Sequence, residues 1–158
     1  MSPVTLVADP GWPAWHGWLG AAIIKTAQPS AIYHTGIVIG DTLFEALVTT
    51  GVGAVPAADR VRDHWLRVPC PWCRPERAVE VFETCAGAEY DLLRGLPDWF
   101  LRRVARTLGV RIRPGIDDPR RWFCSELSAA MLGFDDPVRY SPSRLMWDAL
   151  MKSAGATP

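Results

Sequence analysis

Residues 32–48 read IYHTGIVIGDTLFEALV, two β-rich runs separated by Gly40-Asp41. A Gly-X pair between two such runs favours a two-residue type II′ turn, so we expect an antiparallel hairpin. That turn places Gly36 opposite Glu45 and makes His34 a diagonal neighbour of Glu45 on the same face, with Gly36 leaving space between them. A turn one residue longer or shorter would put the two polar side chains on opposite faces.

Shorter patterns flank this hairpin on both sides. The basic loop 111–121 has aspartates among its arginines, which indicates a solvated face rather than a nucleic-acid site. Pro and Gly break the aromatic stretch 12–18, so we expect a loop there. The remaining spacings predict strands at 4–8 and 65–68 and helices at 19–27, 76–86, 99–108, 123–133 and 145–151. We therefore expect a single domain over residues 1–158, of the α+β class, with an antiparallel sheet packed against helices.

The composition excludes several classes of protein. A chain of 158 residues with 49% hydrophobic and 22% charged residues is neither disordered nor collagenous. Its 17 basic residues equal its 17 acidic ones, so neither nucleic acid nor an anionic membrane is an expected partner. No apolar run approaches the roughly 20 residues that span a bilayer, and the N-terminus lacks a signal-peptide pattern. We expect a cytoplasmic protein without an integral membrane segment, with phage association or export by another route as alternatives.

Cys124 stands where a helix is expected to begin. The partial positive charge of a helix N-terminus stabilises a thiolate, which makes such a cysteine a candidate nucleophile. A thiol nucleophile also needs a base and a group that orients the base. His34 and Glu45, which the hairpin brings together, are the candidates for these two roles. The competing interpretations are a buried small hydrophobic residue for Cys124, a sheet-end residue for His34 and an exposed strand residue for Glu45.

Five strings in chain order match a family pattern together: YHTGIVI at 33–39, FEA at 44–46, GV at 51–52, EYD at 89–91 and FCSEL at 123–127. They resemble the permuted branch of the NlpC/P60 papain-like superfamily, which includes YiiX/YaeF-type amidases and, more distantly, lecithin retinol acyltransferase. In that branch the histidine strand precedes the cysteine helix, as it does here. The resemblance implies a papain-like fold, a Cys124 nucleophile, a His34 base and an orienting Glu45. It further implies that Tyr90 lies near the active site and helps to hold the oxyanion; a core position is the alternative for Tyr90.

The other three cysteines allow a second interpretation. Cys70, Cys73 and Cys85 together with His64 contain one Cys-x-x-Cys pair, so a Cys₃His zinc site is an alternative. A redox disulfide between Cys70 and Cys73 is another, and plain loop or buried cysteines are a third. A typical zinc pattern has a second close ligand pair, which this set lacks. We therefore expect neither a metal nor a cofactor.

The sequence thus predicts a cysteine hydrolase that cleaves an amide or ester bond through a thioacyl-enzyme on Cys124. A peptide, a peptidoglycan fragment or an acyl compound is the expected substrate. An acyltransferase of the same fold is one alternative, and it differs only in what accepts the acyl group. The alternative outside the enzymes is a structural or interaction protein that binds through the tryptophan-rich stretch 12–18.

Overall fold

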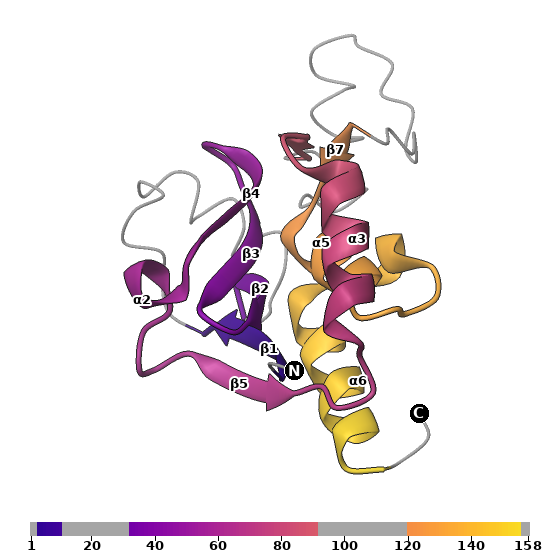
Figure 1. Ribbon diagram of the computed structural model, residues 1–158. Helices are drawn as coiled ribbons and strands as arrows, with labels where there is room; N and C mark the ends of the chain where they lie inside the picture. The colour runs from indigo at the N-terminus through magenta and orange to yellow at the C-terminus, as the bar shows by residue number, and fades with distance from the viewer. Residues whose placement is uncertain (1–2, 11–31, 92–119, 156–158) are drawn as a thin grey trace, which may run out of the picture.

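A five-stranded antiparallel sheet has its longer helices packed on one face and a short helix on the other (Figure 1). The structure, a computed structural model, describes residues 3–10, 32–91 and 120–155. The strands of the sheet are β1 (Val4–Asp9), β2 (His34–Ile39), β3 (Thr42–Leu47), β4 (Gly51–Pro56) and β5 (Leu66–Pro69). Their order across the sheet is β4-β3-β2-β1-β5, and every neighbouring pair is antiparallel. The predicted α+β class with an antiparallel sheet is confirmed.

The helices of the described residues lie on both sides of this sheet. Helices α3 (Pro75–Cys85), α5 (Cys124–Met131) and α6 (Pro142–Ser153) gather on one side, and the short α2 (Ala57–Arg60) lies on the other (Figure 1). A 3₁₀ turn, η1 (Pro137–Arg139), connects α5 to α6. Two short strands, β6 (Glu89–Tyr90) and β7 (Arg121–Trp122), pair in parallel beside the start of α5.

The β2–β3 hairpin has the predicted register. The two strands pair from Ile39–Thr42 to Gly36–Glu45. Gly40 has a φ of 60°, and Asp41 is not among the residues with positive φ. A positive φ at the first of two turn residues is the type II′ geometry, which glycine adopts without steric cost. The register that places His34 and Glu45 on one face is therefore confirmed.

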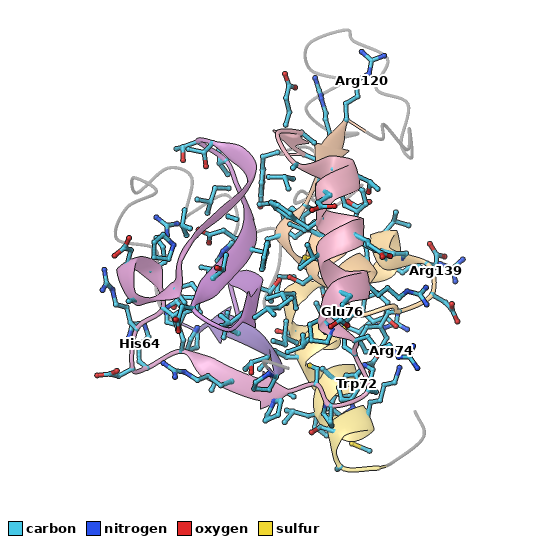
Figure 2. The ribbon with its side chains drawn as sticks, in the orientation of Figure 1. His64, Trp72, Arg74, Glu76, Arg120 and Arg139 are labelled. Atoms are coloured by element: carbon cyan, nitrogen blue, oxygen red, sulfur yellow. The ribbon has the colours of Figure 1, made fainter. Side chains whose placement is uncertain are left out.

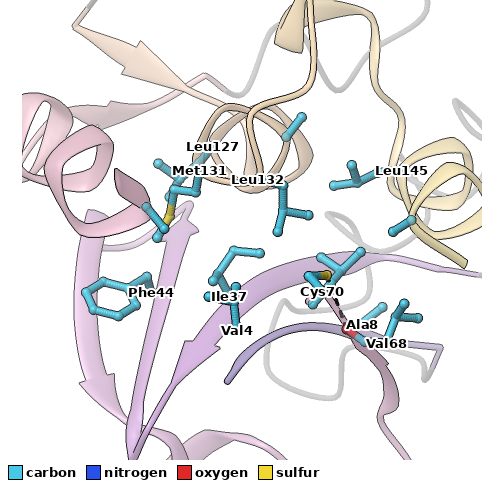
Figure 3. Close-up of a cluster of buried hydrophobic side chains, with 14 of the residues drawn as sticks. Val4, Ala8, Ile37, Phe44, Val68, Cys70, Leu127, Met131, Leu132 and Leu145 are labelled. Carbon is cyan, nitrogen blue, oxygen red and sulfur yellow. Dashed lines mark hydrogen bonds between the residues drawn. The ribbon is translucent and has the colours of Figure 1, made fainter. Parts of the chain in front are cut away.

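Side chains of the sheet alternate between a helix-covered face and a second face. The main core lies under the helices, where Ile37, Leu127 and Leu145 are fully buried (Figure 3). A smaller cluster that contains Leu43 and Trp65 lies on the opposite face, beside α2. His34 and Glu45 lie on this second face, because side chains alternate along each strand. His34 is three positions before Ile37, which points into the main core. Glu45 is two positions after Leu43, which belongs to the smaller cluster.

Helix α5 is the central element of the helix layer. It packs against β2, β3, α3 and α6. Ser125, Ser128 and Ala129 have no exposed surface, and their small side chains let neighbouring elements approach closely on more than one side. A helix that is buried almost all round shows little amphipathic pattern, and apart from Glu126 in its first turn the residues of α5 are apolar or small.

Several elements differ from the sequence-based prediction, which does not include α2, β6, β7 or η1. Strand β4 was not expected, because Gly51, Gly53 and Pro56 all disfavour strands. It pairs with β3 along its full length and lies at the edge of the sheet, where proline and glycine are tolerated. Helix α6 begins earlier than predicted, at Pro142, because Ser141 accepts a hydrogen bond from the Arg144 N–H and caps the helix.

Several expectations fall outside the described residues. They are the aromatic loop 12–18, the helices 19–27 and 99–108 and most of the basic loop 111–121. None of the helices within 3–10, 32–91 and 120–155 is both long and apolar enough to cross a membrane.

Candidate active site

Cys124 is the first residue of α5 and is almost completely buried. Phe123 occupies the N-cap position, and its N–H donates to the carboxylate of Glu126 over 3.4 Å. The amides of the first helical turn have no acceptor within the helix, so the helix presents a partial positive charge beside the thiol. The expected position of Cys124 at a helix N-terminus is confirmed.

His34 and Glu45 form a buried hydrogen-bonded pair. The Nε2–H of His34 donates to Oε2 of Glu45 over 2.7 Å, and both side chains are shielded from solvent. Trp65 packs edge-on against the imidazole, with ring centroids 5.9 Å apart. Because Nε2 is bonded to Glu45, Nδ1 is the ring nitrogen that is left for the thiol, and the carboxylate fixes the ring orientation.

Gly36 makes room for this pair. A Cβ on Gly36 would lie 2.7 Å from Cδ1 of Leu43 and 3.5 Å from Cβ of Glu45. The first distance is far below a van der Waals contact, so with any other residue the Leu43 side chain would have to shift. The space at Gly36 is therefore limited mainly by Leu43, and the contact with Glu45 would be an ordinary one.

The site lies where β2 and β3 separate. Hydrogen-bonded pairs alternate along a hairpin, and after Ile39–Thr42 and Ile37–Phe44 the next such pair would be Thr35 with Ala46. The pairing instead stops at Gly36–Glu45, and the Thr35 N–H donates to the sulfur of Cys124. The N-terminus of α5 thus contacts β2 where the pairing with β3 has stopped, which brings Cys124 to His34.

A second polar contact holds α5 in this position. The hydroxyl of Ser128 donates to the Cys124 carbonyl over 2.9 Å and lies 3.3 Å from the hydroxyl of Thr35. All three residues are buried, so their polar groups are satisfied by one another across the helix–strand contact. This contact fixes Cys124 relative to β2.

The pKa values of Cys124 and His34 are displaced in opposite directions. Burial by itself raises the pKa of the Cys124 thiol, but the hydrogen bond and charge of His34, with the N–H of Thr35 and the hydroxyl of Tyr90, lower it below its ordinary value. Burial by itself lowers the pKa of His34, but its contacts with Cys124 and Glu45 outweigh burial and raise the pKa to about 9. These directions favour a thiolate paired with an imidazolium near neutral pH.

Tyr90 lies against the same thiol. Strand β6 pairs with β7 so that Tyr90 is opposite Trp122, two residues before Cys124. Its ring packs on Phe123 with centroids 5.5 Å apart, and its hydroxyl donates to the Cys124 sulfur. Burial, and then the charge and hydrogen bond of Cys124, raise the pKa of Tyr90 well above its ordinary value, so the hydroxyl stays protonated. The structure therefore brings Cys124, His34, Glu45 and Tyr90 together, as the sequence and the family resemblance suggested.

Three neighbours of the site were not singled out from the sequence. Arg60 at the end of α2 has its Nε 3.2 Å from Oε1 of Glu45. Asp9 is the cross-strand partner of His34 and lies 3.4 Å from Nε2 of His64. Trp65 packs on His34 as described above. Each reaches the site through strand order or through α2, which no local pattern in the sequence specifies.

The other cysteines do not gather around a metal. Their thiols donate to separate backbone carbonyls: Cys70 to Val68, Cys73 to Met131 and Cys85 to Val81 and Phe82. In Figure 2, His64 lies on the sheet side, whereas Trp72, which lies between Cys70 and Cys73 in sequence, is beside α6. Within the ranges that the structure describes, no group of three His, Cys, Asp or Glu residues is arranged to hold a metal ion.

These cysteines also differ from Cys124 in their ionisation, and all four are free thiols. Burial raises the pKa of Cys70 and of Cys85 to about 11, and it raises the pKa of Cys73 as well. They are therefore protonated at neutral pH and poor nucleophiles. Among the four, Cys124 has the lowered pKa and the imidazole partner.

Comparison of the chain with protein-family models, with curated proteins and with solved structures found no match.

Proposed function

We propose that the protein is a cysteine hydrolase, of the amidase or peptidase type, that cleaves an amide or ester bond through a thioacyl-enzyme on Cys124. The observation that carries this proposal is the buried chain of contacts from Cys124 to His34 to Glu45. It supplies a thiol at a helix N-terminus, a base hydrogen-bonded to that thiol and a carboxylate that orients the base. The three residue types also match the family resemblance, and an antiparallel sheet packed on the cysteine helix agrees with the papain-like fold that we include in the proposal.

The first half of the proposed reaction forms the acyl-enzyme. The Cys124 thiolate attacks the substrate carbonyl carbon, a C–S bond forms, and the carbonyl π electrons move to the oxygen. The backbone amides at the start of α5 and the Tyr90 hydroxyl stabilise this oxyanion. When the tetrahedral intermediate collapses, the C–N or C–O bond breaks and the His34 imidazolium gives its proton to the leaving group.

The second half returns the enzyme to its starting state. Neutral His34 takes a proton from water, which attacks the thioester carbonyl. Collapse of the second tetrahedral intermediate breaks the C–S bond, releases the carboxylic acid and restores the thiolate beside the imidazolium. The Glu45 carboxylate stabilises the imidazolium in both halves, in the way that the third member of a catalytic triad does.

The proposal is tested first with an electrophile and then with substrates. The full-length protein is treated with iodoacetamide at neutral pH, and the modified cysteine is identified by peptide mass. We expect alkylation of Cys124 to be much faster than that of Cys73, which is only partly buried but has a raised pKa. Equal labelling of the two thiols would contradict the proposed thiolate.

Substrates are then tested on Cys124→Ala and on a matched control, Cys73→Ala. A panel of activated esters, peptide amides and peptidoglycan fragments is incubated with each variant, and thioacyl adducts are sought by intact mass. We expect turnover and a thioacyl adduct in the wild type and in Cys73→Ala and neither in Cys124→Ala, with little change in melting temperature because the replaced thiol is small. Unaltered turnover in Cys124→Ala would disprove the assignment, and products formed on an added amine or alcohol would indicate an acyltransferase.

A further inference from the structure

We propose that Arg60 is a positioning residue, whose guanidinium compensates the charge of the buried Glu45 carboxylate and so supports the contact of that carboxylate with His34. This inference rests on the proposed cysteine chemistry, but its test needs no substrate. It adds a fourth group to the chain of contacts that begins at Cys124.

The two oxygens of Glu45 are divided between two cationic partners. Oε2 accepts the His34 hydrogen bond at 2.7 Å, and Oε1 lies 3.2 Å from Nε of Arg60. Glu45 is only 2% exposed, and its Oε1 makes no hydrogen bond of good angle in the described part of the chain. The guanidinium is therefore what compensates the second oxygen, by charge rather than by an aligned hydrogen bond.

The fold holds Arg60 over this oxygen. Helix α2 follows directly on β4, the neighbour of β3, and contacts both strands. Arg60 is the last residue of α2, where the Val61 N–H donates to the Ala57 carbonyl over 2.8 Å and closes the turn. The Arg60 side chain is about two thirds buried, so its charge is only partly screened by water.

The sum of the charges in the site explains the role of the Arg60 guanidinium. With a thiolate at Cys124, an imidazolium at His34, a carboxylate at Glu45 and a guanidinium at Arg60, the charges alternate and sum to zero. Without Arg60 the same buried group carries one net negative charge, and an uncompensated buried charge is costly. The thiolate, which adds a further negative charge to this group, would then become less favourable.

Other ionisable groups face the site from the packed elements. They are Asp9 from β1, His64 near Asp9, Tyr90 from β6 and Cys124 from α5. Among the residues that the structure describes, Arg60 is the basic side chain in contact with Oε1 of Glu45. Arg60 is therefore the group whose removal changes the charge balance at this carboxylate.

The test compares Arg60→Met and Arg60→Lys with Arg62→Met as the control. Arg62 is two residues farther along, and its guanidinium donates to the Asp59 carbonyl, at 3.1 Å on the surface. The rate of iodoacetamide alkylation at Cys124 is measured in each full-length variant between about pH 5 and pH 10, with the site resolved by peptide mass. Thermal melts of each variant confirm that it is folded, and Arg60→Gln replaces Arg60→Met if the latter is not.

We expect the acidic limb of the alkylation profile to move upward by about 0.5 to 1 pH unit in Arg60→Met, a modest shift because the guanidinium is partly exposed. Arg60→Lys, which keeps the charge, should recover most of the wild-type profile, and Arg62→Met should match the wild type. An unshifted Arg60→Met profile, or an equal shift in Arg62→Met, would overturn the role of Arg60 while leaving the cysteine chemistry intact. Slow alkylation of Cys124 in the wild type would overturn both.

Discussion

At the scale of single residues, the chemistry of the site depends on the two partners of the buried His34 imidazole, which raise its pKa. A buried imidazole with no partner is held neutral, whereas His34 has Glu45 on one side and Cys124 on the other. The two anionic partners outweigh burial, so the ring stays protonated well into the alkaline range. The same contacts lower the pKa of Cys124, and the two residues titrate as one coupled pair.

The pH dependence of turnover follows from this coupling. The imidazolium is the proposed acid for the leaving group, and the pKa of His34 is raised to about 9. Activity should therefore persist through neutral pH and fall as the pH rises through about 9, where the imidazolium loses its proton. His34→Ala should be inactive and should slow alkylation near neutral pH, because the thiol pKa returns toward about 8.5. A His34→Ala variant with the wild-type alkylation rate would show that the two side chains are uncoupled.

Glu45→Gln tests the third member of the chain of contacts. The amide keeps the size of the side chain and still accepts a hydrogen bond, but it removes the negative charge. The pKa of His34 should fall and the pKa of Cys124 should rise. The pH range over which the enzyme is active should therefore become narrower at both its acidic and its alkaline limit. We expect a smaller loss of activity than in the Cys124 or His34 variants. If the variant were active over the same pH range as the wild type with the same substrate, the carboxylate would not stabilise the imidazolium.

At the scale of elements, the close approach of β2 and β3 at Gly36 decides whether His34 meets Glu45. Gly36→Ala would place a methyl group 2.7 Å from a Leu43 side-chain carbon and 3.1 Å from the Phe44 carbonyl oxygen. Overpacking of this kind costs about 1–3 kcal/mol. We expect a lower free energy of unfolding and slower Cys124 alkylation together, because the Leu43 side chain and the Phe44 carbonyl would both have to shift beside the site.

Gly53→Ala is the matched control for that experiment. Gly53 lies opposite Glu45 on β4, and a Cβ there would meet nothing within 4 Å. Denaturant unfolding and alkylation should therefore be close to those of the wild type. If both glycine variants behaved alike, the contact with Leu43 would not be what positions the pair.

At the scale of the whole molecule, α5 joins the core to the site. Its first residue is Cys124, and its side chains Leu127 and Met131 lie fully buried in the main cluster (Figure 3). Packing of the helix against the sheet therefore also sets where the thiol lies relative to His34. A loss of core packing should affect both stability and reactivity.

The substitution Leu127→Ala tests how far the packing of α5 stabilises the protein. Truncation of a fully buried leucine typically costs about 2–5 kcal/mol, because the transfer free energy is lost and a cavity remains. We expect a drop of that size in the free energy of unfolding by urea, whereas Leu150→Ala on the exposed part of α6 should change it by about 0.5 kcal/mol or less. Equal effects of the two substitutions would contradict the central position of α5.

Local patterns in the sequence were enough to predict where His34, Glu45 and Cys124 lie in their own elements. The length of the turn determined the hairpin register, and the register placed His34 beside Glu45, because strand side chains alternate with a period of two residues. The helical spacing after Phe123 put Cys124 at a helix start. The position of Tyr90 beside the thiol came from the family resemblance and not from any spacing.

Only the tertiary structure decided how the β2–β3 hairpin, α5 and α2 come into contact. The separation of β2 from β3 at Thr35 gives the thiol a backbone donor, and it depends on α5 entering from a segment about ninety residues farther along the chain. The contact of Arg60 with Glu45 depends on β4 pairing at the sheet edge in spite of its glycines and proline. Turn length and side-chain periodicity act between near neighbours in sequence, whereas these contacts arise from the packing of distant elements, which no local pattern specifies.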